Sequence, residues 1–318
     1  MNKFLKIIKS PTIGISSLVI TLAALIISLW QTYQTKEIID SISTRYVGEF
    51  PATMGPLNKL LLNAKESIVI LEDVLGYGMF SAPDEFHKYI TILDKKSADG
   101  KLKLELVIYN RDVNLRVTKM QFIGSEHIDK FKSLRYEKNN AKTEEERDAV
   151  INKIVEFRNS IFTAFLAKKE NKEKWQYLME YDFSNKARQE GKNGYNQLNE
   201  VKNVFKDRDI ESIKFDEFAD MLITFDDRIK TILTAGGRSN VKIDTVGIMH
   251  SMNCWLIDNT EAIFGFTRSF GSSEIAFITK DPQLTTHINS LKNITIFLEE
   301  DPYGEYVDDE STTSKIIK

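Results

Sequence analysis

The stretch MHSMNCWLIDNTEAIFGF, residues 249–266, contains two short apolar runs on either side of a polar turn. The runs CWLIDN (254–259) and AIFGFT (262–267) have the length and composition of buried strands, and Asn259-Thr260 is a turn signal. The stretch therefore predicts a β-hairpin. His250 stands just before the hairpin. It is either a histidine held by hydrogen bonds at the edge of the core or the remains of a catalytic motif.

Two further strand patterns flank the hairpin. VKIDTVGIMH (241–250) precedes it, and EIAFIT (274–279) follows it after the turn signal GSS. The next segment, DPQLTTHINSLKN, has Asp281 at a helix N-cap and Pro282 at the first helical position. The last third of the chain therefore predicts four strands followed by a helix.

A strand–helix–strand pattern lies earlier in the chain. SIVILED (67–73) is apolar and β-branched, and residues 84–96 carry apolar side chains on one helical face. KLKLELVIYN (101–110) alternates at first and then becomes fully apolar, and a helix at 57–65 precedes all three. This order predicts an α/β domain in which the two strands are parallel neighbours.

The middle of the chain has a different character. Residues from about 126 to 206 are rich in Lys, Glu and Asn, with apolar positions at helical spacing. This pattern predicts two or three surface helices inserted between the halves of the sheet. A long helix follows at about 216–234, and its apolar stripe predicts packing against the sheet, with a dimer seam as the alternative. Gly236-Gly237 ends that helix.

The N-terminus predicts a membrane anchor. No residue from Ser10 to Thr35 is charged, and the run IGISSLVITLAALIISLW meets the roughly 20 apolar residues that a helix needs to cross a bilayer. Trp30 and Tyr33 fall where interfacial aromatic residues are typical. A cleaved signal peptide would have a shorter apolar core and a small-residue cleavage site. Residues 1–35 therefore predict an uncleaved, single-pass transmembrane helix.

The charges around this span bear on its orientation. Three lysines precede it, against Lys36 and Arg45 after it, which favours a cytoplasmic N-terminus by one charge and leaves the side of the large domain open. Residues 36–56 predict a stalk or linker, helical over 36–46, and residues 299–318 predict an acidic tail. A composition rich in Lys, Asn and Ile fits an AT-rich bacterial genome, so we expect a bacterial inner or plasma membrane.

The composition excludes several classes of function. The 318 residues carry a formal net charge of −3, which does not support the basic face that a nucleic-acid binder needs. The one cysteine, Cys254, excludes a disulfide framework and a cysteine-based zinc site within one chain. The sequence has no glycine-rich phosphate loop and no metal-ligand cluster, so we expect no cofactor and no metal.

The order of elements resembles the phospholipase D-like superfamily. There the signature H-x-K-x4-D is followed by a turn rich in Gly, Ser or Thr, and a glutamate then opens the next strand. Here SSEIAFITKDPQLTTHI is the most specific match, and LLNAKESIVILED through LELVIYN is similar to the family's N-terminal strand–helix–strand. The resemblance covers roughly residues 57–110 and 240–295. It implies an α/β fold, a phospholipase D-like mixed sheet flanked by helices over 57–298, with the helical insertion inside it.

The family's chemistry assigns roles to particular residues. Two histidines meet at one phosphate: one attacks phosphorus and the other protonates the leaving oxygen, while lysines neutralise the phosphoryl charge. By resemblance, His250 is the catalytic histidine and Glu274 is the later glutamate. Met252 stands at the lysine position, Asp258 falls one residue late, and Arg268 could supply the missing cation. Since the chain carries one such motif, a complete site implies a homodimer.

Further ligand-binding candidates lie at the end of the first predicted strand. Glu72 and Asp73 end it where open α/β sheets bind ligands, so they join Asp258 and Arg268, with solvated strand-end acids as the alternative. Because methionine cannot neutralise a phosphate, we expect a catalytically degenerate module at the membrane that binds a ligand, or a protein partner through the helical insertion. The alternatives are a dimeric phosphodiesterase that uses His250 on lipid or nucleic acid, and a self-assembling membrane scaffold.

Overall fold

The computed structural model describes residues 25–31, 33–34, 43–76, 78–123, 127–184, 193–247, 252–266 and 275–297. Within these residues, the centre of the molecule is a mixed sheet of seven strands in the order β1-β7-β6-β5-β2-β3-β4. The strands are β1 (Thr44–Glu49), β2 (Ser67–Glu72), β3 (Lys103–Tyr109), β4 (Val241–Val246), β5 (Met252–Ile257), β6 (Glu261–Phe266) and β7 (Ile275–Thr279). The α-helices after β1 are α3 (Met54–Asn63), α4 (Pro83–Ala98), α5 (Arg111–Ile123), α6 (Ile128–Asn139), α7 (Glu144–Ala167), α8 (Lys169–Glu180), α10 (Asn196–Asn203), α11 (Phe215–Thr234) and α12 (Pro282–Phe297).

The sheet has a parallel part and an antiparallel part. β3 runs parallel to both β2 and β4, because helices carry the chain back between these strands. β5 pairs antiparallel with β2, and β5, β6 and β7 are antiparallel neighbours in sequence order. The prediction of an α/β fold with a mixed sheet, in which β2 and β3 are parallel neighbours, is confirmed.

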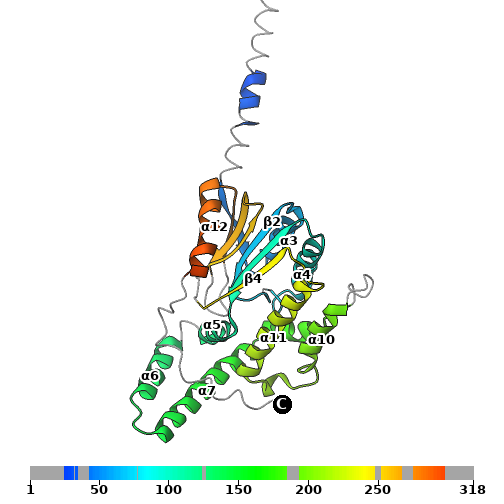
Figure 1. The fold of residues 1–318 in the computed structure, drawn as a ribbon. Coiled ribbons are helices and arrows are strands. Elements are labelled where there is room, and N and C mark those ends of the chain that lie inside the picture. Colours follow the sequence, from blue (N-terminus) through cyan, green and yellow to red (C-terminus); the bar gives the residue numbers. More distant parts are fainter. Residues whose placement is uncertain are drawn as a thin grey trace, which may run out of the picture.

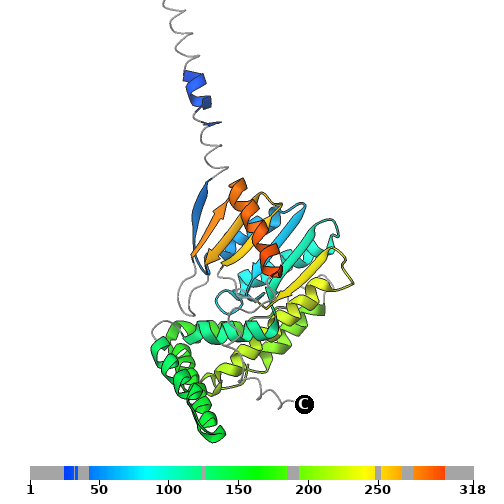
Figure 2. The same ribbon diagram turned by 60° about the vertical axis from the view of Figure 1, so that its left-hand side comes forward.

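Helices cover both faces of the sheet (Figures 1 and 2). On one face, α3 and α4 pack over Ile68 and Ile70 of β2, and the same core extends to the buried side chains of α11. On the other face, α5 and α12 pack over Val69 and Leu71 of the same strand. Both faces of β2 are therefore buried, which explains why SIVILE is apolar without alternation. The aromatic stripe of α11 is buried in the first of these cores, where α11 packs against α4 and α10. Its predicted place in the core is confirmed, and direct packing against the sheet stays a prediction.

The predicted insertion is helical. Its described residues form four α-helices, α6, α7, α8 and α10, where two or three were expected. α6 and α7 form a pair that projects away from the sheet (Figures 1 and 2). This pair has a small core of its own, made by Leu134, Val150 and Ile154.

The segment before residue 57 differs from the prediction of a stalk that is helical over 36–46. Residues 44–49 form β1, which pairs antiparallel with β7 and places Tyr46 opposite Phe277, with ring centroids 5.9 Å apart. α3 then begins at Met54, whose side chain is fully buried. The folded domain therefore starts at the first strand and not at residue 57. TRYVGE has no apolar alternation, and its strand form comes from pairing with β7.

The predicted transmembrane segment lies largely outside the described residues. Its described part, residues 25–31 and 33–34, is helical and has exposed apolar side chains. Among the residues described here, no helix has both the length and the apolar character required to span a bilayer. The acidic tail, residues 299–318, also lies outside the described part of the chain.

Candidate functional site

The parallel strands β2, β3 and β4 end at one edge of the sheet, which we call the carboxyl edge. β5 begins at this edge, since Leu71 near the end of β2 pairs with Cys254 near the start of β5. β6 ends there and β7 begins there, because Phe266 pairs with both Met252 and Ile275. Ligands of open α/β sheets bind outside the carboxyl ends of the strands. The carboxyl edge is therefore the candidate functional site.

Three predicted site residues, His250, Arg268 and Glu274, lie outside the described residues. The described residues that flank them in sequence do lie at the carboxyl edge. Gly247 and Met252 flank His250, and Phe266 and Ile275 flank the segment that contains the other two. The chain therefore brings the neighbours of all three candidates to one edge of the sheet.

Asp258 lies at the opposite edge. It follows β5 and faces the start of β2, where its carboxylate accepts hydrogen bonds from the backbone N–H groups of Lys65, Glu66 and Ser67 at 2.7–3.2 Å. Burial raises the pKa of this carboxyl, but the hydrogen bonds outweigh that effect and hold the pKa below its usual value. The structure thus places Asp258 at the edge opposite to Asp73 and to the described residues that flank the other candidates. Asp258 fixes the β5–β6 turn against the start of β2.

Glu72 is inside the core rather than at the surface of the carboxyl edge. Its side chain is 0% exposed, and its Oε2 accepts a hydrogen bond of 2.9 Å from the hydroxyl of Tyr89 on α4. That hydroxyl accepts a hydrogen bond of 3.1 Å from Nε1 of Trp255 on β5. The expected contact between Glu72 and a ligand does not fit this burial, because the carboxylate faces side chains of the core.

Asp73 does lie at the carboxyl edge, although it is only 7% exposed. Its backbone N–H donates to Asn253 Oδ1 at 3.3 Å, which joins the end of β2 to β5. Its own Oδ1 accepts a hydrogen bond of 2.9 Å from the N–H of Val74. Asp73 therefore orders the chain that leaves β2.

A second acid at this edge, Asp226 on α11, was not predicted from the sequence. Its Oδ1 accepts a hydrogen bond of 2.8 Å from the backbone N–H of Gly76, and its Oδ2 accepts one of 2.9 Å from Nδ2 of Asn114 on α5. Burial raises the pKa of Asp226 to about 7. The signal that could have identified this acid is its spacing. Position 226 lies four residues after Leu222 and three before Ile229, on the flank of the apolar stripe.

Gly76 favours this contact because it has no side chain. A Cβ atom at this position would lie 3.3 Å from Oδ1 of Asp226, closer than an ordinary contact. The absence of a side chain lets the backbone after β2 approach the acid. The described part of the carboxyl edge is therefore a tightly packed junction of acids, amides and backbone.

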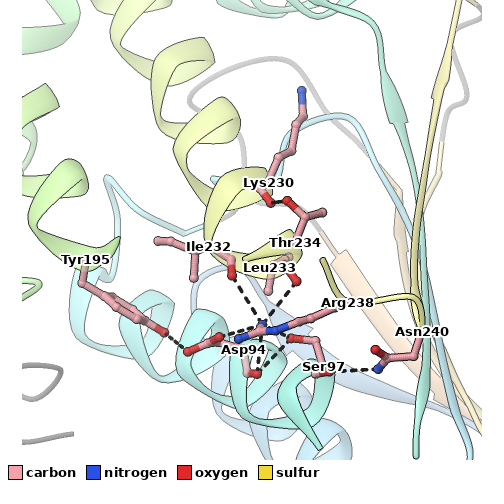
Figure 3. Close-up of polar contacts among 9 residues, drawn as sticks. All are labelled: Asp94, Ser97, Tyr195, Lys230, Ile232, Leu233, Thr234, Arg238 and Asn240. Carbon is pink, nitrogen blue, oxygen red and sulfur yellow. Dashed lines mark hydrogen bonds and ion pairs between the residues drawn. The ribbon is translucent and has the colours of Figure 1, made fainter. Parts of the chain in front are cut away.

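A second polar cluster lies at the other end of the strands (Figure 3). Arg238 donates a hydrogen bond of 2.8 Å to Asp94 on α4 and also contacts two carbonyl groups at the end of α11. Tyr195 donates to the second oxygen of Asp94 at 3.4 Å, and Asn240 donates to the carbonyl of Ser97 at 2.9 Å. This cluster joins α4, α11 and the start of β4, and its groups bond to one another. We interpret it as structural.

Metal and thiol chemistry have no described residues to carry them. Among the residues that the structure describes, no three His, Cys, Asp or Glu side chains are grouped so that they could hold a metal ion. Cys254 is fully buried, and burial raises the pKa of its thiol.

Comparison with known proteins adds no family. A scan against protein-family models gives no match, and a search of curated proteins gives none either. The function therefore rests on the chemistry of the site itself.

Proposed function

We propose that the protein is a membrane-anchored module with a phospholipase D-like fold that binds a ligand or a protein partner and does not hydrolyse phosphodiesters. The parallel pair β2 and β3, the antiparallel strands β5 to β7 and the helix α12 follow the order that the resemblance implies. Asp281 caps α12 as expected, since its Oδ1 accepts hydrogen bonds from the N–H groups of Gln283 and Leu284. These features support the fold assignment.

The observation that carries the absence of catalysis is the position of Met252. This residue stands where the family has its lysine, and its partly buried side chain packs against the apolar cluster that includes Cys254 and Phe264. A thioether in apolar surroundings gives a phosphate no neutralising charge. By analogy with the loss of one oxyanion donor, the missing interaction would cost about 3 kcal/mol of transition-state stabilisation. Asp73 and Asp226, also at this edge, would repel a phosphate when ionised.

The decisive experiment measures phosphodiester hydrolysis by the full-length protein in detergent micelles, with bis(p-nitrophenyl) phosphate as substrate. We expect the wild-type protein, His250→Ala and the control variant His287→Ala to give the same background rate. His287 suits the control because it lies on the exposed side of α12. Turnover that His250→Ala abolishes and His287→Ala leaves intact would establish an enzyme and overturn the proposal.

Membrane attachment is supported by the described helix at residues 25–31 and the residues just after it. Leu25, Ile27, Leu29, Trp30 and Tyr33 are all more than half exposed, and so wide an exposed apolar face needs a lipid or protein environment. We expect the full chain to stay with membranes after extraction with alkaline carbonate. A chain that begins at residue 36 should be released, and equal release of both would contradict the anchor.

The surface that we propose for binding a protein partner is the projecting helix pair α6 and α7. α6 packs against α7 through Phe131 and Leu134, and it exposes Ile128 and Tyr136 on its outer side, 45% and 72% respectively. Chemical crosslinking in native membranes should give a product with another protein that the double variant Ile128→Ser, Tyr136→Ser loses. A product that contains only this chain would indicate the homodimer instead.

The dimeric phosphodiesterase is the second candidate function. It is favoured by the convergence at the carboxyl edge of the described residues that flank His250, Arg268 and Glu274. This function requires both a crosslinked homodimer and turnover that depends on His250. The same two experiments therefore separate the two candidates.

A further inference from the structure

Asp226 is a buried acid at the carboxyl edge that joins three separate segments of the chain. It belongs to α11, and it accepts one hydrogen bond from Asn114 on α5 and one from the backbone N–H of Gly76 in the chain after β2. Its side chain is almost fully buried, at 3% exposure. In Figure 1, α5 and α11 lie below the edge at which the parallel strands end. The two hydrogen bonds therefore hold the chain that leaves β2 against the helices beneath that edge.

The charged side chains near Asp226 come from all three of these segments. Asp73, at the end of β2, raises the pKa of Asp226, and Lys230, one turn further along α11, lowers it. Arg111, at the start of α5, directs its guanidinium to two acids on the exposed side of α11, at 3.4 and 3.7 Å. The charged set around the junction is Asp73, Arg111, Asp220, Asp227 and Lys230.

We infer that Asp226 is a proton-dependent clamp of the carboxyl edge. With its carboxyl group protonated, Asp226 places no charge in the core, and its oxygens keep the capacity to accept the hydrogen bonds from Gly76 and Asn114. The end of β2 is then held closed against α5 and α11. Loss of the proton leaves a charge that water solvates better than the core does. The junction then opens more often.

The direction of the pH dependence follows from the two states. Burial, reinforced by Asp73, raises the pKa of Asp226 in the closed state to about 7, against the lowering effects of Gly76, Lys230 and Asn114. In an opened junction water solvates the carboxyl, and its pKa returns toward the usual 3.8. Between these two values the closed state holds a proton that the open state has lost. Opening therefore becomes more frequent as the pH rises through this window, by at most about tenfold per pH unit, and levels off above it.

Hydrogen exchange of the full-length protein in detergent micelles tests the clamp without any ligand. Protection factors, corrected for the intrinsic pH dependence of exchange, are measured for peptides that contain Gly76 and Asn114. For the wild-type protein we expect protection to fall by about tenfold or more between about pH 5 and about pH 7.5. Asp226→Asn should remove this dependence, and the matched variant Asp227→Asn, an exposed neighbour on the same helix, should keep it.

Two charge variants give the inference a second, independent test. Asp73→Asn should move the pH at which exchange levels off to a lower value, because Asp73 raises the pKa of Asp226. Lys230→Gln should move it to a higher value. Protection that does not change with pH in the wild-type protein, an unchanged slope in Asp226→Asn, or shifts of the same sign in the two charge variants would overturn the clamp. All of these outcomes are independent of whether the protein hydrolyses a phosphodiester.

Discussion

The hydroxyl group of Tyr89 lies 2.9 Å from Oε2 of Glu72 and donates a hydrogen bond to it inside the core. The same hydroxyl accepts a hydrogen bond from Trp255, so three side chains connect α4, β2 and β5. None of the three is more than 1% exposed. A carboxyl group kept from water depends on such partners, because an unsatisfied buried polar group costs more than one hydrogen bond contributes.

Tyr89→Phe should therefore destabilise the protein strongly, although the substitution removes only the hydroxyl oxygen. We expect the free energy of unfolding to fall by about 2–3 kcal/mol, because the carboxylate of Glu72 and the indole N–H of Trp255 both lose their shared partner. Urea denaturation of the full-length protein measures this change. Tyr136→Phe is the matched control, since Tyr136 is 72% exposed and should shift the free energy by less than about 0.5 kcal/mol. Equal stability of the two variants would show that the bond to Glu72 is unimportant.

Asp258→Gly should weaken the turn between β5 and β6. Asp258 has a φ of 50°, which glycine also adopts, so the substitution removes the carboxylate without adding backbone strain. We expect the free energy of unfolding to fall by about 1–2 kcal/mol, because the backbone N–H groups of Glu66 and Ser67 lose the hydrogen bonds that the Asp258 carboxylate accepts. Urea denaturation near neutral pH measures it, with the exposed Asp99→Asn as control.

The pH dependence of this contribution has a definite sign. The pKa of Asp258 is lower in the folded protein than its usual 3.8. Its stabilising effect is therefore fully present above the usual value and is lost as the pH falls through the folded pKa. The difference between the wild-type protein and Asp258→Gly should shrink in denaturation measurements below about pH 4. A constant difference down to about pH 2 would contradict the role given to the ionised carboxylate.

The fold could be predicted wherever burial leaves a pattern in the sequence. SIVILED, the stripe of α11 and the Asp281-Pro282 helix start all have periodicity or capping residues that follow from local physics. β1 could not be predicted in this way, because its strand form depends on β7, more than 200 residues later in the chain. α5 likewise has no strong apolar periodicity, and its position follows from the end of β3.

The candidate site could be predicted only in part. The strand order brings the sequence neighbours of His250, Arg268 and Glu274 to the edge where their motif implies a site. Asp258 is at the other edge because β5 runs antiparallel to β2, and only the sheet topology reveals that direction. Asp226 was not anticipated, because its spacing places it beside the apolar stripe of α11 but does not show which chain segments cover it.

The ion pair between Arg238 and Asp94 gives a prediction about coupling. Asp94→Asn should lower the free energy of unfolding by about 3 kcal/mol, because it leaves the charge of Arg238 in a largely buried position. The double variant with Arg238→Met should lose less than the sum of the two single losses, since neither partner is then left as an isolated charge. Denaturation of all four proteins measures the coupling. Strict additivity would mean that the pair seen in Figure 3 contributes no interaction of its own.

The folded domain starts at β1. A chain that begins at residue 43 keeps β1, whereas a chain that begins at residue 50 loses it and leaves the outer edge of β7 unpaired. An open strand edge promotes association between molecules, and the loss of Tyr46 also uncovers the ring of Phe277. We expect the shorter chain to have a melting temperature lower by several degrees and to form higher oligomers in size-exclusion chromatography. If residues 44–49 were instead part of a stalk, the two chains would melt together and elute as the same species.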